Sequence, residues 1–124
     1  MTDIELTKND LIIRMQGIDK ILAIKDQVQV PLKHIMGVWD GIDEETQAEF
    51  KHSIRLPGMY MPGIVIVGTF VVRGKKMFWD VHHDKSKVIT IKVSDDEYIK
   101  LVLQVEDPAA TVAAIQQAFQ ASPV

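Results

Sequence analysis

Residues 98–121, YIKLVLQVEDPAATVAAIQQAFQA, decide the fold. In the first part, Leu101 and Leu103 alternate with other side chains, which predicts a strand because successive side chains of a strand point to opposite faces. Asp107 and Pro108 then predict the start of a helix, since aspartate is a favoured N-cap and proline a favoured first helical residue. The segment therefore predicts a final strand that runs into a terminal helix.

That helix carries one apolar stripe. Val112, Ile115 and Phe119 recur at the spacing of a single helical face, and the pattern ends near Ala121. An apolar stripe of this kind has to be buried against another element. We expect the helix to close one end of a β-structure, with Phe119 buried in the core.

The chain before residue 98 reads as a series of short strands. Alternating segments separated by turn residues are typical of an antiparallel barrel or sandwich. Strands are predicted at residues 3–16 (a hairpin), 20–24, 28–30, 34–39, 64–72, 77–82 and 89–93. Residues 42–53 are the exception and predict a short solvated helix or an excursion loop, with Asp43 as its cap. The fold class is mainly β with one C-terminal helix.

Residues 56–63, LPGMYMPG, contain two Pro-Gly pairs. Such pairs suit the central positions of type II turns, so we expect a well-defined loop here. Tyr60 lies between the two turns and, with Met59 and Met61, would form an apolar tip for a partner or a membrane surface. The alternative is that the loop folds back as a lid on the core, and the sequence leaves both open.

Composition limits the possible functions. The chain has 124 residues and 14.0 kDa, which predicts a single domain over 1–124, and it has no cysteine. A net charge of -3 and a pI near 5.7 argue against non-specific nucleic-acid binding. The N-terminal residues resemble no signal peptide, and the uncharged stretch 56–72 falls short of the roughly 20 apolar residues of a membrane helix. We expect a cytoplasmic protein in which peripheral membrane contact stays possible.

No motif predicts catalysis. His82 and His83 are adjacent in a strand and point to opposite faces, so they cannot readily bind one ion. Alternation predicts that Trp79 packs inside while Asp80 faces water or accepts a hydrogen bond from a neighbouring loop. We therefore expect no enzyme activity, no cofactor, no bound metal and no small-molecule substrate.

Basic residues gather at two places. Arg73, Lys75 and Lys76 share one predicted hairpin tip, and Arg55 precedes the Pro-Gly segment. Lysines and arginines at a hairpin tip are usually solvated, but these four together would form an anion site. With Tyr60 they make up the candidate binding residues.

Several stretches resemble a group of small bacterial proteins of pleckstrin-homology-like type. They are KILAIKDQVQVPLKHIMGV, RLPGMYMPGIVIVGTF, MFWDVH, VITIKV and YIKLVLQVEDPAATVAAI. The resemblance implies a barrel of two orthogonal antiparallel sheets with a C-terminal helix, and it implies no activity, since fold does not carry function. The leading hypothesis is a non-enzymatic binding or assembly module that meets a protein partner, or a second copy of itself, through an exposed strand edge or the Pro-Gly loop. The alternative is an anionic-ligand or lipid-headgroup binder.

Overall fold

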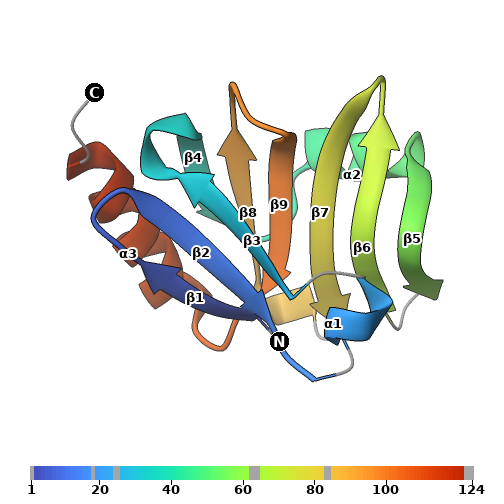
Figure 1. Cartoon of the computed structure of the whole chain (residues 1–124), viewed down its shortest axis with the longest axis horizontal. Helices are drawn as coiled ribbons and strands as arrows, with labels where there is room; N and C mark the ends of the chain where they lie inside the picture. The colour runs from blue at the N-terminus through green and yellow to red at the C-terminus, as the bar shows by residue number, and fades with distance from the viewer. Residues whose placement is uncertain (1, 18, 24–25, 62–64, 83–84, 122–124) are drawn as a thin grey trace.

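The computed structural model describes residues 2–17, 19–23, 26–61, 65–82 and 85–121, and over these residues it forms two sheets (Figure 1). The three-stranded sheet has the order β1 (Thr2–Leu6), β2 (Asp10–Met15), β3 (Gln27–Pro31). The six-stranded sheet has the order β4 (Ile35–Asp40), β8 (Val88–Val93), β9 (Tyr98–Gln104), β7 (Lys75–His82), β6 (Val65–Val72), β5 (Ile54–Met61). The prediction of a mainly β fold is confirmed.

Helices flank these sheets. The α-helices are α1 (Asp19–Leu22), α2 (Glu44–Lys51) and α3 (Pro108–Ala121), and short 3-10 turns span Leu32–His34 and Lys85–Lys87. Figure 1 shows the small sheet crossing one face of the large sheet obliquely, with α2 on the opposite face and α3 beside β4. No helix among the described residues has the length and apolar character needed to cross a membrane.

The large sheet is buried on both faces. Phe78 packs into the layer between the two sheets, whereas its neighbour Trp79 packs on the other face, where Phe50 of α2 lies 4.6 Å from it between ring centroids. Burial on both sides makes the central strands nearly continuous in apolar residues. Trp79, which was expected to pack inside, is buried, and the large sheet also buries Ile89, Ile91, Leu101 and Leu103. Phe119 is only half-buried, because it packs at the margin of the layer between the sheets.

The terminal helix begins where the sequence predicts. The Asp107 carboxylate accepts a hydrogen bond from the backbone N–H of Ala110 at 3.1 Å, which is N-cap geometry. Ile115 is fully buried against the layer between the sheets. The predicted hairpin at 3–16 is also confirmed, with Thr2 opposite Met15 in its antiparallel register.

The expected antiparallel barrel is wrong in two respects. Over the described residues the two sheets remain separate and form no closed barrel. The large sheet is also mixed, because β7 pairs with β9 in parallel. After β7 the chain skips the neighbouring position of the sheet and forms β8 one position further along. The next strand, β9, then lies between β7 and β8.

Two predicted local structures also differ. Residues 20–24 were expected as a strand, but the N–H of Ala23 donates to the carbonyl of Asp19 at 2.9 Å and closes the single helical turn of α1. Gly17, at φ 57, ends β2 just before it. An apolar run of this length cannot distinguish strand from helix by periodicity.

The first Pro-Gly pair is not a turn. Pro57 and Gly58 lie inside β5, at a register shift between Arg55 and Gly58. Proline lacks the N–H that a sheet ladder needs, so it is tolerated at a bulge in an edge strand. Pro62 and Gly63, the second pair, lie outside the described residues.

Candidate functional site

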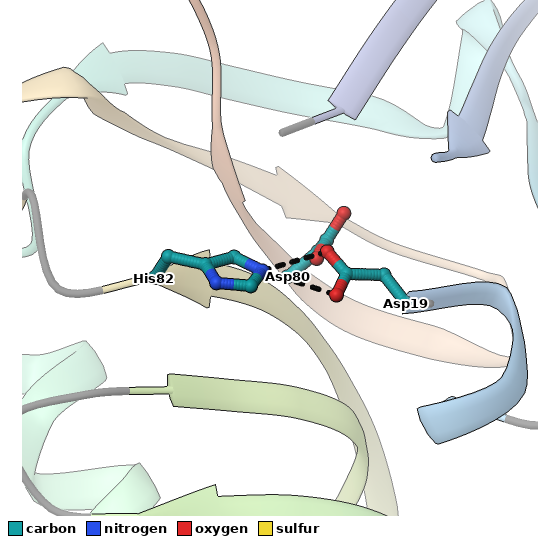
Figure 2. A group of neighbouring side chains, drawn as sticks. All are labelled: Asp19, Asp80 and His82. Atoms are coloured by element: carbon teal, nitrogen blue, oxygen red, sulfur yellow. Dashed lines mark hydrogen bonds and ion pairs between the residues drawn. The ribbon is translucent and has the colours of Figure 1, made fainter. Parts of the chain in front are cut away.

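Three side chains with metal-ligand chemistry meet where α1 approaches β7, and we call them the Asp-His centre: Asp19, Asp80 and His82 (Figure 2). Asp80 and His82 are two residues apart on β7 and therefore share one face of the strand. Asp19 is the first residue of α1. His82 Nε2 lies 2.8 Å from Asp19 Oδ2 and 3.0 Å from Asp19 Oδ1.

Asp80 is completely buried, so it does not face water, which was one of the two roles predicted for it; the other was to accept a hydrogen bond from a neighbouring loop. Its Oδ2 accepts a hydrogen bond from Thr2 Oγ1 at 2.7 Å, while its Oδ1 accepts none from any described group. The side chain of His82 is 37% exposed, so the Asp-His centre reaches the surface at this residue. The backbone N–H of His82 donates to Gln104 Oε1 at 2.9 Å, which fixes the end of β7 against β9.

The two carboxyl groups differ in acidity. Burial, with the neighbouring carboxyl group of Asp19, raises the pKa of Asp80 to about 7. Burial alone would raise the pKa of Asp19 too, but its interactions with Asp80 and His82 outweigh it and hold this pKa below 3.8. Asp19 therefore carries the negative charge that faces His82, and Asp80 is the weaker acid of the two.

This centre was not predicted from the sequence. Adjacent His82 and His83 point to opposite faces of a strand, whereas Asp80 and His82, two residues apart, share one face. Asp19 lies 63 residues from His82, and no local pattern links the two. His83 lies outside the described residues.

A second feature, the basic cleft, lies between α2 and the β6–β7 hairpin, on the opposite face of the large sheet from the Asp-His centre. Its volume is about 290 Å³. Its charged lining consists of the cations Arg73, Lys75, Lys92 and Lys100 and the acids Glu45 and Glu49.

Both acids of the cleft are paired with the same lysine. Lys100 is only 2% exposed, and its Nζ lies 3.1 Å from Glu45 Oε1 and 2.5 Å from Glu49 Oε1. Burial alone would lower the pKa of Lys100, but the two glutamates raise it above 10.5. Lys100 is therefore a charged group in the wall of the cleft, a role that strand alternation did not predict.

The structure brings only some of the predicted binding residues together. Arg73 and Lys75 both line the basic cleft. Lys76, from the same hairpin, instead forms an ion pair with Glu97 at 3.0 Å. The backbones of Arg55 and Tyr60 lie on β5, opposite Phe70 and Ile66 of β6. Their side chains lie outside what the structure describes.

The expected exposed strand edge is present at β5. Within the described residues β5 pairs with β6 alone, so one side of it is an edge of the large sheet. Ile54, at the start of β5, is 72% exposed. Proline and bulges are features that limit pairing at an edge, and Pro57 lies at such an irregularity here.

Comparison with known proteins found no matching family model, no matching curated protein and no matching solved structure, so the function is inferred from the residues of this chain.

Proposed function

We propose that this domain is a non-enzymatic binding module that takes an anionic, phosphate-bearing ligand in the basic cleft. The observation that carries the proposal is an imbalance of charge. Arg73, Lys75 and Lys92 line the cleft and form no ion pair with any acid of the described chain. The two acids of the cleft, in contrast, are both engaged by Lys100.

The cations suit a phosphate group in complementary ways. The guanidinium of Arg73 presents a planar fork that matches two oxygens at once, and the ammonium groups of Lys75 and Lys92 act as point charges. A volume of about 290 Å³ is at the small end of the range for ligand sites. The net charge of the whole chain is -3, so the chain as a whole does not attract polyanions. Both points favour a small phosphate-bearing group over an extended polyanion.

The backbone at the rim of the cleft supports a role for Arg73. The β6–β7 turn has φ 52 at Arg73 and φ 76 at Gly74. Two consecutive positive φ values define a type I′ turn, for which Asn-Gly and Asp-Gly are the preferred pairs. A positive φ is unfavourable for arginine, and strained backbone of this kind is concentrated at binding sites. A function for the side chain in the cleft accounts for that cost.

Kinship with pleckstrin-homology-like proteins belongs to the same proposal. Two packed sheets and a C-terminal helix support it. The parallel pairing of β7 with β9 departs from the expected architecture. The proposed ligand does not depend on this kinship.

A second candidate function is self-association through the edge of β5. The observation that favours it is the exposure of Ile54, an apolar side chain at the start of an edge strand. An unpaired edge offers backbone N–H and C=O groups to a second strand. This function would not involve the basic cleft.

Calorimetric titration with inorganic pyrophosphate tests the cleft directly. We expect binding that weakens as salt is added and that Lys92→Ser weakens by about fivefold, since one charge at close range in water contributes about 1 kcal/mol. Lys8→Ser is the matched control, because Lys8 is exposed in the turn between β1 and β2 and does not line the cleft. Equal loss in both variants, or no binding by the wild type, would contradict the proposal.

Co-sedimentation distinguishes a lipid headgroup from a soluble ligand. Vesicles of phosphatidylcholine alone would be compared with vesicles that also contain phosphatidylserine, each at low and high salt. Capture only by the anionic vesicles, reversed by salt and by Lys92→Ser, assigns the cleft to a membrane surface. Pyrophosphate binding without capture assigns it to a soluble phosphate compound.

A further inference from the structure

We infer that Asp19, Asp80 and His82 form a binding site for a divalent first-row transition-metal ion, with Zn²⁺ as the best match. The site is independent of the basic cleft. Asp80 and His82 lie on the face of β7 that also carries Phe78, between the two sheets. The cleft lies on the α2 face.

The geometry is that of a preformed ligand set. One potential ligand atom from each residue lies within 4.8 Å of the others. Metal–ligand distances of about 2.0–2.2 Å place neighbouring ligand atoms about 3 Å apart. His82 Nε2 already lies 2.8 Å from one carboxylate oxygen of Asp19 and 3.0 Å from the other. Figure 2 shows the carboxyl group of Asp80 beside that of Asp19, with the imidazole of His82 facing them.

A buried atom without a partner is the second, independent observation. Asp80 is 0% exposed, and its Oδ1 has no hydrogen-bond donor among the described groups. A buried carboxylate oxygen without a donor or a cation is costly. Thr2 Oγ1 holds the other oxygen at 2.7 Å, in the way that outer hydrogen bonds orient metal-ligating carboxylates. A bound cation would complete the coordination of Asp80.

An ion pair between His82 and Asp19 does not by itself explain why the carboxyl group of Asp80 is buried beside them. The chain contains another His-Asp pair, in which His34 Nδ1 lies 2.8 Å from Asp96 Oδ2. That pair belongs to no group of three ligand residues within the described chain. At the Asp-His centre, Asp80 is buried beside Asp19, and two carboxylates at close range repel each other. A divalent cation would neutralise both.

The donor set selects the kind of metal. One imidazole nitrogen and two carboxylate oxygens suit Zn²⁺, with Mn²⁺ a weaker alternative, whereas Mg²⁺ favours oxygen ligands and retained waters. Three protein ligands leave at least one position for water. The partly exposed His82 gives the ion a route from solvent.

Titration of the untagged, chelator-stripped full-length chain with Zn²⁺ tests the inference, with heat and thermal unfolding as the two measurements. We expect one ion per chain and a melting temperature that rises with Zn²⁺. His82→Gln and Asp80→Asn should each weaken Zn²⁺ binding by about tenfold or more, since even outer partners of a ligand contribute about that factor. Mn²⁺ should bind more weakly and Mg²⁺ weakest.

His34→Gln is the matched control, because it removes a histidine from a pair with the same 2.8 Å separation. It should leave Zn²⁺ affinity unchanged. If Asp80→Asn fails to fold, His82→Gln decides, because its side chain is partly exposed. Absence of Zn²⁺ binding, or equal loss in His34→Gln and His82→Gln, would overturn the site. Failure here would leave pyrophosphate binding at the cleft untouched.

Discussion

Lys100 of β9 and Glu49 of α2 are 51 residues apart in sequence, and the buried ammonium of the first lies 2.5 Å from a carboxylate oxygen of the second. This contact joins the helix to the large sheet at the wall of the basic cleft. Glu45, 63% exposed, contacts the same ammonium from the solvent side. The cleft therefore keeps its shape through one buried cation shared by two acids.

Replacing Lys100 should show how that cation contributes to stability. Its pKa is raised above 10.5 in the folded protein, so its contribution is complete below the unfolded pKa and is lost as pH rises through the higher folded pKa. We expect Lys100→Met to lower the unfolding free energy by about 2 kcal/mol near neutral pH, less than for a fully buried pair because the glutamates are partly solvated. Urea unfolding measures the difference.

That difference between wild type and Lys100→Met should stay constant up to about pH 10 and shrink above it. Glu44→Gln serves as the control, since Glu44 is exposed on α2 and does not line the cleft. A difference that disappears between about pH 7 and pH 9 would show that Lys100 is not held in its charged form.

Arg73→Asn should separate stability from binding. Asparagine adopts positive φ more easily than arginine and is favoured before glycine in a type I′ turn. We expect the unfolding free energy to stay equal or rise by up to about 1 kcal/mol, while pyrophosphate affinity falls. Chemical denaturation and calorimetry measure the two effects. A variant that is clearly less stable would mean that the arginine side chain serves the fold.

Leu103→Ala should be strongly destabilising. Leu103 is fully buried in the layer between the two sheets, and removal of a buried leucine side chain costs about 2–5 kcal/mol. Ile54→Ala, at a 72% exposed position, should shift stability by about 0.5 kcal/mol or less. Urea unfolding compares the two variants, and a near-neutral Leu103→Ala would contradict the packing of β9.

Ile54→Lys tests self-association at the β5 edge. A charge at an exposed edge position opposes pairing with a second strand. If the wild type forms dimers in light scattering after size-exclusion chromatography, the variant should be monomeric at the same concentration. Lys8→Ser should behave as the wild type. A wild-type protein that stays monomeric over a wide concentration range would remove the second candidate function.

Local signals in the sequence predicted individual elements well. Asp107 and Pro108 located the start of α3, because capping chemistry depends on a few adjacent residues. The alternation of side chains predicted the strands, but it does not identify which strands pair with each other. The parallel pairing of β7 with β9 was therefore missed. The turn predicted at Pro57 was wrong for a related reason, because an edge strand also accepts proline.

The sites were harder to predict because they are tertiary. Arg73 and Lys75 were recognised from one hairpin, but Lys92 and Lys100 come from other strands. Asp19 joins the Asp-His centre only through the packing of α1 near β7. No periodic pattern in a sequence links residues that lie this far apart along the chain.

The most direct test of the proposed function is a titration of isotope-labelled protein with inorganic pyrophosphate, followed by amide NMR. We expect the amide shifts to be confined to the basic cleft, at Arg73, Lys75, Lys92 and their neighbours, with those of β5 unchanged. Added salt should reverse them. Shifts centred on β5, or no shifts at all, would contradict the assignment of the cleft as the binding site.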